Sequence, residues 1–124
     1  MGLPAVYTSE SISLAALEVL VHLEKSEVPV DYVALGIELS DDQVRDLSMG
    51  EARRVESLCS SPTMSVETFG REFYTHPVLR VPSVIIPREH NYVLLPAAAR
   101  FQARILWVEP FQFDPRLFSS ATQA

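Results

Sequence analysis

The residue types that most often carry out chemistry in proteins are scarce and widely spaced in this sequence. Histidine occurs only at positions 22, 76 and 90, and Cys59 is the single cysteine. Their separations do not match the spacing of zinc ligands, and no nucleophile-elbow motif is present, although a triad assembled only by folding stays open. Glycines at positions 2, 36, 50 and 70 cannot form a dinucleotide-binding or phosphate-binding loop. We therefore predict no metal site and no standard nucleotide loop.

Glu18 is the acidic residue with the most informative neighbourhood. At about 100° per residue, Ser11, Glu18, His22 and Lys25 fall on one narrow stripe of an otherwise apolar helix. From the pattern alone, a solvated polar stripe is the favoured interpretation, and it needs no catalysis. A cleft lined by this stripe would satisfy both the structural and the catalytic interpretation.

Length, charge and cysteine content indicate a cytoplasmic protein. The 124 residues, of which 48% are hydrophobic, suit one globular domain. A net charge of −6 disfavours direct binding to nucleic acid. One cysteine allows no disulfide within the chain, which favours a reducing compartment. The N-terminus lacks a basic, apolar leader, and the apolar run 12–23 is too short to span a bilayer. We expect a soluble cytoplasmic protein, and homo-oligomerisation stays open.

The first third of the chain is predicted to contain an extended segment, a helix and a strand. Residues 4–8 form a short extended run. Ser9 is expected to cap a helix that has Glu10 in its first turn and continues to about Lys25. Alternating apolar residues over 31–39 predict a strand with one apolar face.

The remainder is predicted to form short helices followed by short strands. Expected helices cover 41–47, 51–58 and 66–74. Proline-punctuated strands are expected at 78–81, 84–86, 92–95, 104–108 and 111–113. The predicted class is α+β, with helices against a mixed, mostly antiparallel sheet. We expect one domain over 1–118 and a tail at 119–124.

Several segments, in order along the chain, resemble the RES-domain toxins of Xre/RES type II toxin–antitoxin pairs. The stretch 2–11 and the helix core 14–23, with its Ala-x-x-Glu-Val-Leu-Val-His pattern, are similar to the start of the family signature. Later similarities lie at 69–73, 78–84, 91–96 and 111–118. Phe73 replaces the family tryptophan, and Leu95 stands at the usual asparagine of an Asn-Pro pair.

The resemblance implies a fold like that of diphtheria-toxin-type ADP-ribosyltransferases and cleavage of NAD at the nicotinamide–ribose bond. It identifies Glu18 and Ser83 as the catalytic glutamate and serine of the family's Arg-Glu-Ser set. The arginine belongs to an upstream segment, so we expect no residue of this chain to take its role. The implied partner is an Xre-like, DNA-binding antitoxin that covers the pocket. The alternatives are an inactive module that only binds the antitoxin, and a likeness of fold alone.

Each implied site residue has a chemical role and a plainer structural one. A carboxylate at Glu18 would stabilise positive charge on the ribose. Ser83 would contact the ligand, but a serine at a strand end most often bonds to backbone. Tyr7, with Ser9 beside it, would bind NAD, but Tyr7 is as well explained as a core aromatic. Asn91 would lie near the substrate or form a turn.

Overall fold

The computed structural model describes residues 4–23, 30–59 and 76–118, which form six strands, two α-helices and two short 3₁₀ helices. The strands are β1 Val6–Ser9, β2 Tyr32–Glu38, β3 Val44–Asp46, β4 Val78–Pro82, β5 His90–Leu94 and β6 Arg104–Phe111. The helices are α1 Ile12–His22, α2 Met49–Cys59, η1 Asp41–Gln43 and η2 Pro115–Phe118. This is the mixed α+β class that the sequence predicts.

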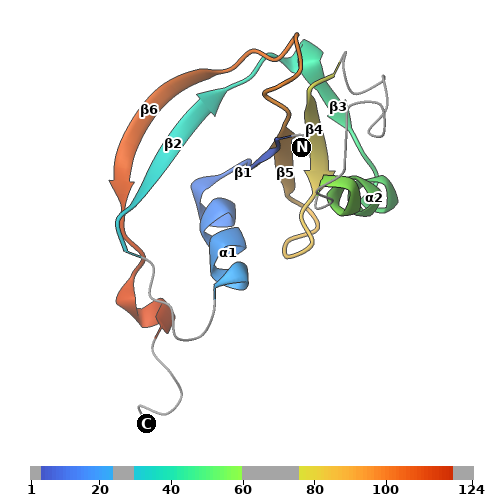
Figure 1. Cartoon of the computed structure of the whole chain (residues 1–124). Helices are drawn as coiled ribbons and strands as arrows, with labels where there is room; N and C mark the ends of the chain where they lie inside the picture. Colours follow the sequence, from blue (N-terminus) through green and yellow to red (C-terminus); the bar gives the residue numbers. More distant parts are fainter. Residues whose placement is uncertain (1–3, 24–29, 60–75, 119–124) are drawn as a thin grey trace.

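The strands form two separate sheets. One sheet has four strands in the order β1-β5-β4-β3, and the other is a ribbon of β2 and β6. Of the strand pairs within the described ranges, β3–β4 alone is parallel. Figure 1 shows α1 between the ribbon and the four-stranded sheet, with α2 on the side away from the ribbon. The helix α1 is therefore placed where both sheets can contribute residues around it.

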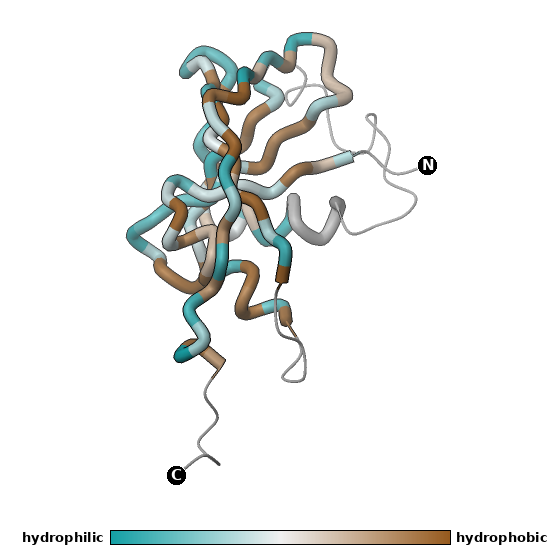
Figure 2. Tube along the Cα trace, turned by 90° about the vertical axis from the view of Figure 1, so that its left-hand side faces the viewer, coloured by the Kyte–Doolittle hydropathy of each residue, from teal (hydrophilic) through white to brown (hydrophobic). Residues whose placement is uncertain are grey.

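The core lies mainly on β4 and β5. Val78, Leu79, Val93 and Leu94 are almost completely buried, and Leu14 of α1 is the helix residue that packs most deeply. Hydrophobic stretches alternate with hydrophilic ones along the chain in Figure 2. Among the described residues, no helix is long and apolar enough to cross a membrane.

Helix α1 begins two residues later than the sequence predicts. Ser11 is the N-cap, and its Oγ accepts a hydrogen bond from the Leu14 N–H at 3.1 Å. The prediction of Ser9 as the cap is wrong, because Ser9 ends β1 and is paired with Asn91. Strand pairing therefore holds the backbone extended up to Ser9. The helix ends at His22, and the predicted end at Lys25 lies outside the described residues.

Three other predicted elements need correction. Residues 41–47 are not one helix, because the chain leaves η1 to form β3, which pairs with β4. Segment 84–86 is a bend and not a strand. Segments 104–108 and 111–113 do not form two strands, because β6 continues through Pro110 to Phe111. A proline is tolerated there because, among the described strands, β6 pairs with β2 alone and keeps its other edge unpaired.

The remaining predictions have mixed outcomes. The helix expected at 51–58 corresponds to α2, and the strands expected at 78–81 and 92–95 correspond to β4 and β5. The helix expected at 66–74 lies outside the described residues. Strand β2 exists as predicted, but two residues of its apolar face, Val33 and Leu35, are 60% and 47% exposed. That face is therefore not part of the core.

Candidate active site

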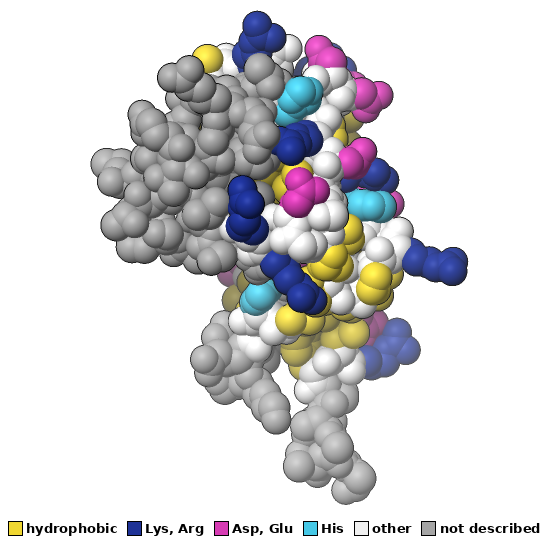
Figure 3. Space-filling model, turned by 90° about the vertical axis from the view of Figure 1, so that its right-hand side faces the viewer, with side chains coloured by type: hydrophobic (Ala, Val, Ile, Leu, Met, Phe, Trp, Pro, Cys, Tyr) yellow, Lys and Arg dark blue, Asp and Glu magenta, His cyan; other side chains and the backbone are white. Residues whose placement is uncertain are grey.

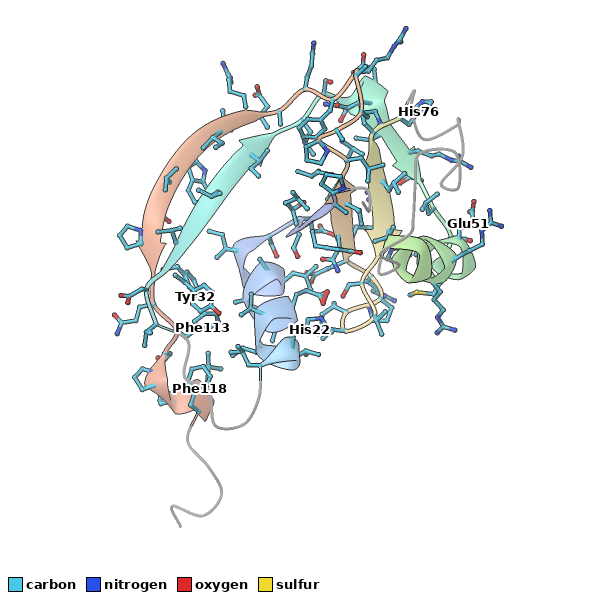
Figure 4. All side chains as sticks on the ribbon, viewed as in Figure 1. His22, Tyr32, Glu51, His76, Phe113 and Phe118 are labelled. Atoms are coloured by element: carbon cyan, nitrogen blue, oxygen red, sulfur yellow. The ribbon has the colours of Figure 1, made fainter. Side chains whose placement is uncertain are left out.

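Glu18 lies on α1, on the side of the helix that faces β5. It is half-buried, whereas His22, one turn later, is exposed. Figure 4 shows His22 at the far end of α1 from β1. The cap at Ser11 fixes where the helix starts, and the helical repeat then sets the direction of Glu18. The carboxylate at the middle of the predicted polar stripe is therefore partly enclosed by the protein.

Two side chains from distant parts of the chain donate hydrogen bonds to the same oxygen of Glu18. Asn91 Nδ2 on β5 donates to Glu18 Oε2. Ser83 Oγ, just after β4, lies 3.5 Å from that oxygen and also donates to it. No hydrogen bond joins Glu18 Oε1 to any described residue. One carboxylate oxygen is therefore held in place, while the other keeps its capacity to interact with a ligand.

Ser83 is completely buried, with 0% of its surface exposed. Its Oγ accepts hydrogen bonds from the N–H groups of Ile85 and Ile86, each at 3.1 Å. The turn is closed by backbone bonds between Ser83 and Glu89 and between Glu89 and Ile86. These contacts explain why 84–86 is a bend and not a strand. They also mean that Ser83 contacts Glu18 from the protein side and has no surface for a ligand.

Ser9 contacts Asn91 and not Glu18. Its Oγ donates to Asn91 Oδ1 at 2.7 Å, while the neighbouring Thr8 Oγ1 donates to the Tyr92 carbonyl oxygen at 2.9 Å. The two hydroxyl groups that follow Tyr7 in the sequence therefore donate their protons within the protein. Four of the five predicted site residues, Ser9, Glu18, Ser83 and Asn91, form one connected network.

Tyr7 is the fifth predicted residue, and it lies apart from that network. It is 57% exposed and lines a cavity of about 600 Å³ between β1, α1 and the β2–β6 ribbon. Trp107 and Phe111 line the same cavity, as does Ser9. Glu18, Ser83 and Asn91 do not line it. Ser9 is thus the member of the network that also borders the cavity.

The aromatic wall of this cavity was not found by sequence reasoning. A Cβ added to Gly36 would lie 2.2 Å from the Trp107 indole, so Trp107 packs directly on the glycine. At the end of the ribbon, Phe113 makes edge contacts with Tyr32 and Phe118. Figure 4 shows these three rings together. The sequence feature that could have revealed this wall is a glycine paired with an aromatic residue on the neighbouring strand. Recognising that pair requires the strand register to be known.

Arg80 is the arginine nearest to the network along β4, but it lies on the opposite face of the sheet. Val81 is paired with Asn91, and successive residues of a strand point to opposite faces. Arg80 instead bonds Asp46 at 3.0 Å and contacts His90 at 3.2 Å. Hydrogen bonding to Asp46, and secondly to Tyr92, raises the pKa of its guanidinium. No salt bridge among the described residues involves Glu18.

Charges and potential metal ligands are dispersed. On the face in Figure 3, Lys and Arg side chains stand among acidic and histidine side chains and do not form a continuous basic patch. Within the parts of the chain that the structure describes, no group of three or more His, Cys, Asp or Glu residues could hold a metal ion. The Glu18 carboxylate is the charged group of the hydrogen-bonded network, and a held carboxylate is suited to acid–base or electrostatic chemistry.

Comparison with known proteins identifies a family model and several toxins of similar sequence. The family model of the RES domain matches residues 1–115. A protein named "Toxin Res" from Photorhabdus laumondii is 37% identical over 124 residues, covering 94% of this chain and 78% of that protein. A "Toxin Res" from Pseudomonas putida is 34% identical, covering 94% and 81%. A "Prs ADP-ribosylating toxin" from a Sphingobium species is 30% identical, covering 98% and 79%.

Proposed function

Because this chain belongs to the RES-domain family, we propose that it is a toxin that degrades NAD by cleaving the nicotinamide–ribose bond. The observation that carries the proposal is the Glu18 carboxylate, whose Oε2 is held by Asn91 and Ser83 while Oε1 has no hydrogen bond to a described residue. The name of the Sphingobium relative, an ADP-ribosylating toxin, supports chemistry at the same substrate.

The reaction develops positive charge on the ribose of NAD. As the bond between ribose C1′ and the nicotinamide nitrogen breaks, its electron pair leaves with nicotinamide, which becomes neutral. The ribose acquires oxocarbenium character, and an acceptor oxygen attacks C1′ and releases its proton. Glu18 Oε1 stabilises the developing charge, or accepts a hydrogen bond from a ribose hydroxyl. A preorganised group of this kind contributes about 3 kcal/mol to lowering the barrier.

The other site residues have graded roles in this proposal. Ser83 acts through Glu18, because it is fully buried. Asn91 holds Glu18 through its hydrogen bond to Oε2. Tyr7 offers an aromatic surface at the cavity for nicotinamide or adenine. No described arginine or lysine forms an ion pair with Glu18, and we assign no residue to the pyrophosphate.

We also propose that the fold is of the diphtheria-toxin-like ADP-ribosyltransferase type. Two sheets, with α1 and a cavity between them, are the features of this structure that support it. Growth arrest would follow from loss of NAD in the cytoplasm. Neutralisation by an Xre-like antitoxin is the corresponding proposal for a partner, and it rests on the family alone.

Release of free nicotinamide from NAD tests the proposed activity. We expect the unaltered chain to release nicotinamide and Glu18→Gln to be slower by about 100-fold or more, because the amide keeps the size but not the charge. Glu109→Gln is the matched control, since Glu109 is exposed on β6, and its rate should be unchanged. Equal rates for the unaltered chain and Glu18→Gln would contradict the proposal.

The identity of the second product distinguishes the possible acceptors. Hydrolysis yields ADP-ribose, phosphorolysis yields its phosphorylated form, and transfer leaves ADP-ribose on a macromolecule. A chain that releases no nicotinamide but co-purifies with an Xre-like antitoxin would instead be an inactive binding module.

A further inference from the structure

We propose that Ser9 is a positioning residue that fixes the side-chain amide of Asn91 and, through it, the Glu18 carboxylate. The inference rests on the proposed function, because it takes Glu18 to be the catalytic group. It assigns to Ser9 a role different from the NAD contact that the sequence predicts. The basis is a chain of two hydrogen bonds, from Ser9 to Asn91 and from Asn91 to Glu18.

The direction of both hydrogen bonds follows from the chemistry of the groups. Asn91 Oδ1 can only accept, so the Ser9 hydroxyl donates to it at 2.7 Å. Asn91 Nδ2 can only donate, and ionised Glu18 Oε2 can only accept. Reversing the amide would place two acceptors, Oδ1 and Oε2, against each other. Ser9 and Glu18 therefore hold the amide of Asn91 from opposite ends in one orientation.

The backbone around Ser9 is held by its neighbours on both sides. Thr8 Oγ1 donates to the carbonyl oxygen of Tyr92. The Glu10 N–H donates to the His90 carbonyl oxygen at 3.1 Å, and the Glu10 carboxylate accepts from the His90 N–H. Three consecutive side chains at the end of β1 thus bond to three consecutive residues of β5. This arrangement fixes the direction in which the Ser9 hydroxyl donates.

The same end of β1 also positions the helix that carries Glu18. Ser11, two residues after Ser9, caps α1 through its bond to the Leu14 N–H. The segment that holds Asn91 through Ser9 therefore continues directly into the residue that caps the helix bearing Glu18. Without the Ser9 hydroxyl, Asn91 Oδ1 loses its partner, and the half-buried amide gains by turning toward water. Glu18 Oε2 then keeps only the longer contact with Ser83.

Kinetics of nicotinamide release test this role with two substitutions of Ser9, to valine and to threonine, whose side chains have the same shape. Ser9→Val removes the hydroxyl and should lower kcat about tenfold, with KM changed less than twofold, because one hydrogen bond to the amide is lost. Ser9→Thr keeps the hydroxyl and should restore the rate to within about twofold. Since both residues are β-branched, this comparison separates hydrogen bonding from side-chain shape and strand propensity.

A double substitution tests whether Ser9 acts through Asn91. If it does, Ser9→Val combined with Asn91→Ala should be no slower than Asn91→Ala alone, because the effects of a shared path do not add. Additive losses would overturn the proposal. So would a Ser9→Thr variant as slow as Ser9→Val.

A measurement independent of activity separates failure of this proposal from failure of the proposed function. In a ¹⁵N–¹H spectrum, the side-chain amide signals of Asn91 are assigned by their loss in Asn91→Asp. We expect them to shift in Ser9→Val and to stay near their original positions in Ser9→Thr. Unchanged signals in Ser9→Val would overturn the positioning role, even if the unaltered chain degrades NAD. A shift in a chain that releases no nicotinamide would retain the network and reject the NAD chemistry.

Discussion

Ser83 Oγ lies 3.5 Å from Glu18 Oε2, although 65 residues separate the two in the sequence. The serine is fully buried and also accepts hydrogen bonds from two backbone N–H groups of the following turn. A single hydroxyl group therefore holds both the turn between β4 and β5 and the carboxylate on α1.

Removal of the Ser83 hydroxyl should destabilise the protein. In Ser83→Ala the N–H groups of Ile85 and Ile86 lose their acceptor, at a cost of about 1–3 kcal/mol in the free energy of unfolding. Urea denaturation measures this change. Ser13→Ala is the control, because Ser13 is exposed on α1 and alanine favours a helix. A Ser83→Ala variant as stable as Ser13→Ala would show that the turn does not depend on the hydroxyl.

The N-cap of α1 should be measurable in the same way. Ser11→Ala removes the acceptor of the Leu14 N–H and should lower the free energy of unfolding by about 1 kcal/mol. Ser11→Asp keeps a capping oxygen and should be close to the original stability. The predicted loss of stability concerns Ser11 and not Ser9. If Ser11→Asp lost as much stability as Ser11→Ala, this result would argue against capping as the cause.

The contact between Gly36 and Trp107 should be intolerant of a methyl group. A Cβ at Gly36 would lie 2.2 Å from the indole, so Gly36→Ala must displace Trp107 and open the cavity wall. Because Trp107 is the only tryptophan, its fluorescence reports the displacement directly. We expect a shifted emission maximum and a loss of about 1–3 kcal/mol. Gly50→Ala is the matched control. A Cβ at Gly50 would lie 4.0 Å from its nearest neighbour, Ser48 Oγ, and alanine suits α2.

The start of α2 should make stability depend on pH in a predictable direction. The Ser48 N–H donates to Glu51 Oε1 at 3.0 Å, and the Glu51 N–H donates to Ser48 Oγ at 3.2 Å. Hydrogen bonds from Ser48 lower the pKa of Glu51 below its ordinary value of 4.5. A carboxyl with a lowered pKa stabilises the folded state above the unfolded value, and this contribution is lost as pH falls through the folded pKa.

The comparison of Glu51→Gln with the unaltered chain measures this dependence. Glutamine can still form the reciprocal bonds, so the substitution isolates the charge. The unaltered chain should be the more stable of the two above pH 4.5, and the difference should shrink as the pH is lowered below that value. A difference that stays constant with pH would show that the charge of Glu51 contributes nothing to α2.

Local features of the sequence were sufficient to place a helix around Glu18, but not to place the N-cap of that helix. A helix repeats every 3.6 residues, so the stripe through Ser11, Glu18 and His22 can be read without knowing the rest of the fold. The α+β class and the strands β4 and β5 follow from the same kind of short-range pattern. The ordered motifs along the chain also identified the RES-domain family, which the match over residues 1–115 confirms.

Long-range pairing decided what the sequence could not. Ser9 is a good N-cap by residue type, but its partner is Asn91, 82 residues away, and pairing with β5 keeps it in a strand. Residues 84–86 have strand composition, but the Ser83 hydroxyl bends them. Both outcomes depend on which distant groups come within hydrogen-bonding reach, and local propensities of a few tenths of a kcal/mol yield to such contacts. The sequence alone therefore determined the family and the helix that bears Glu18, and only the tertiary structure decided which side chains hold its carboxylate.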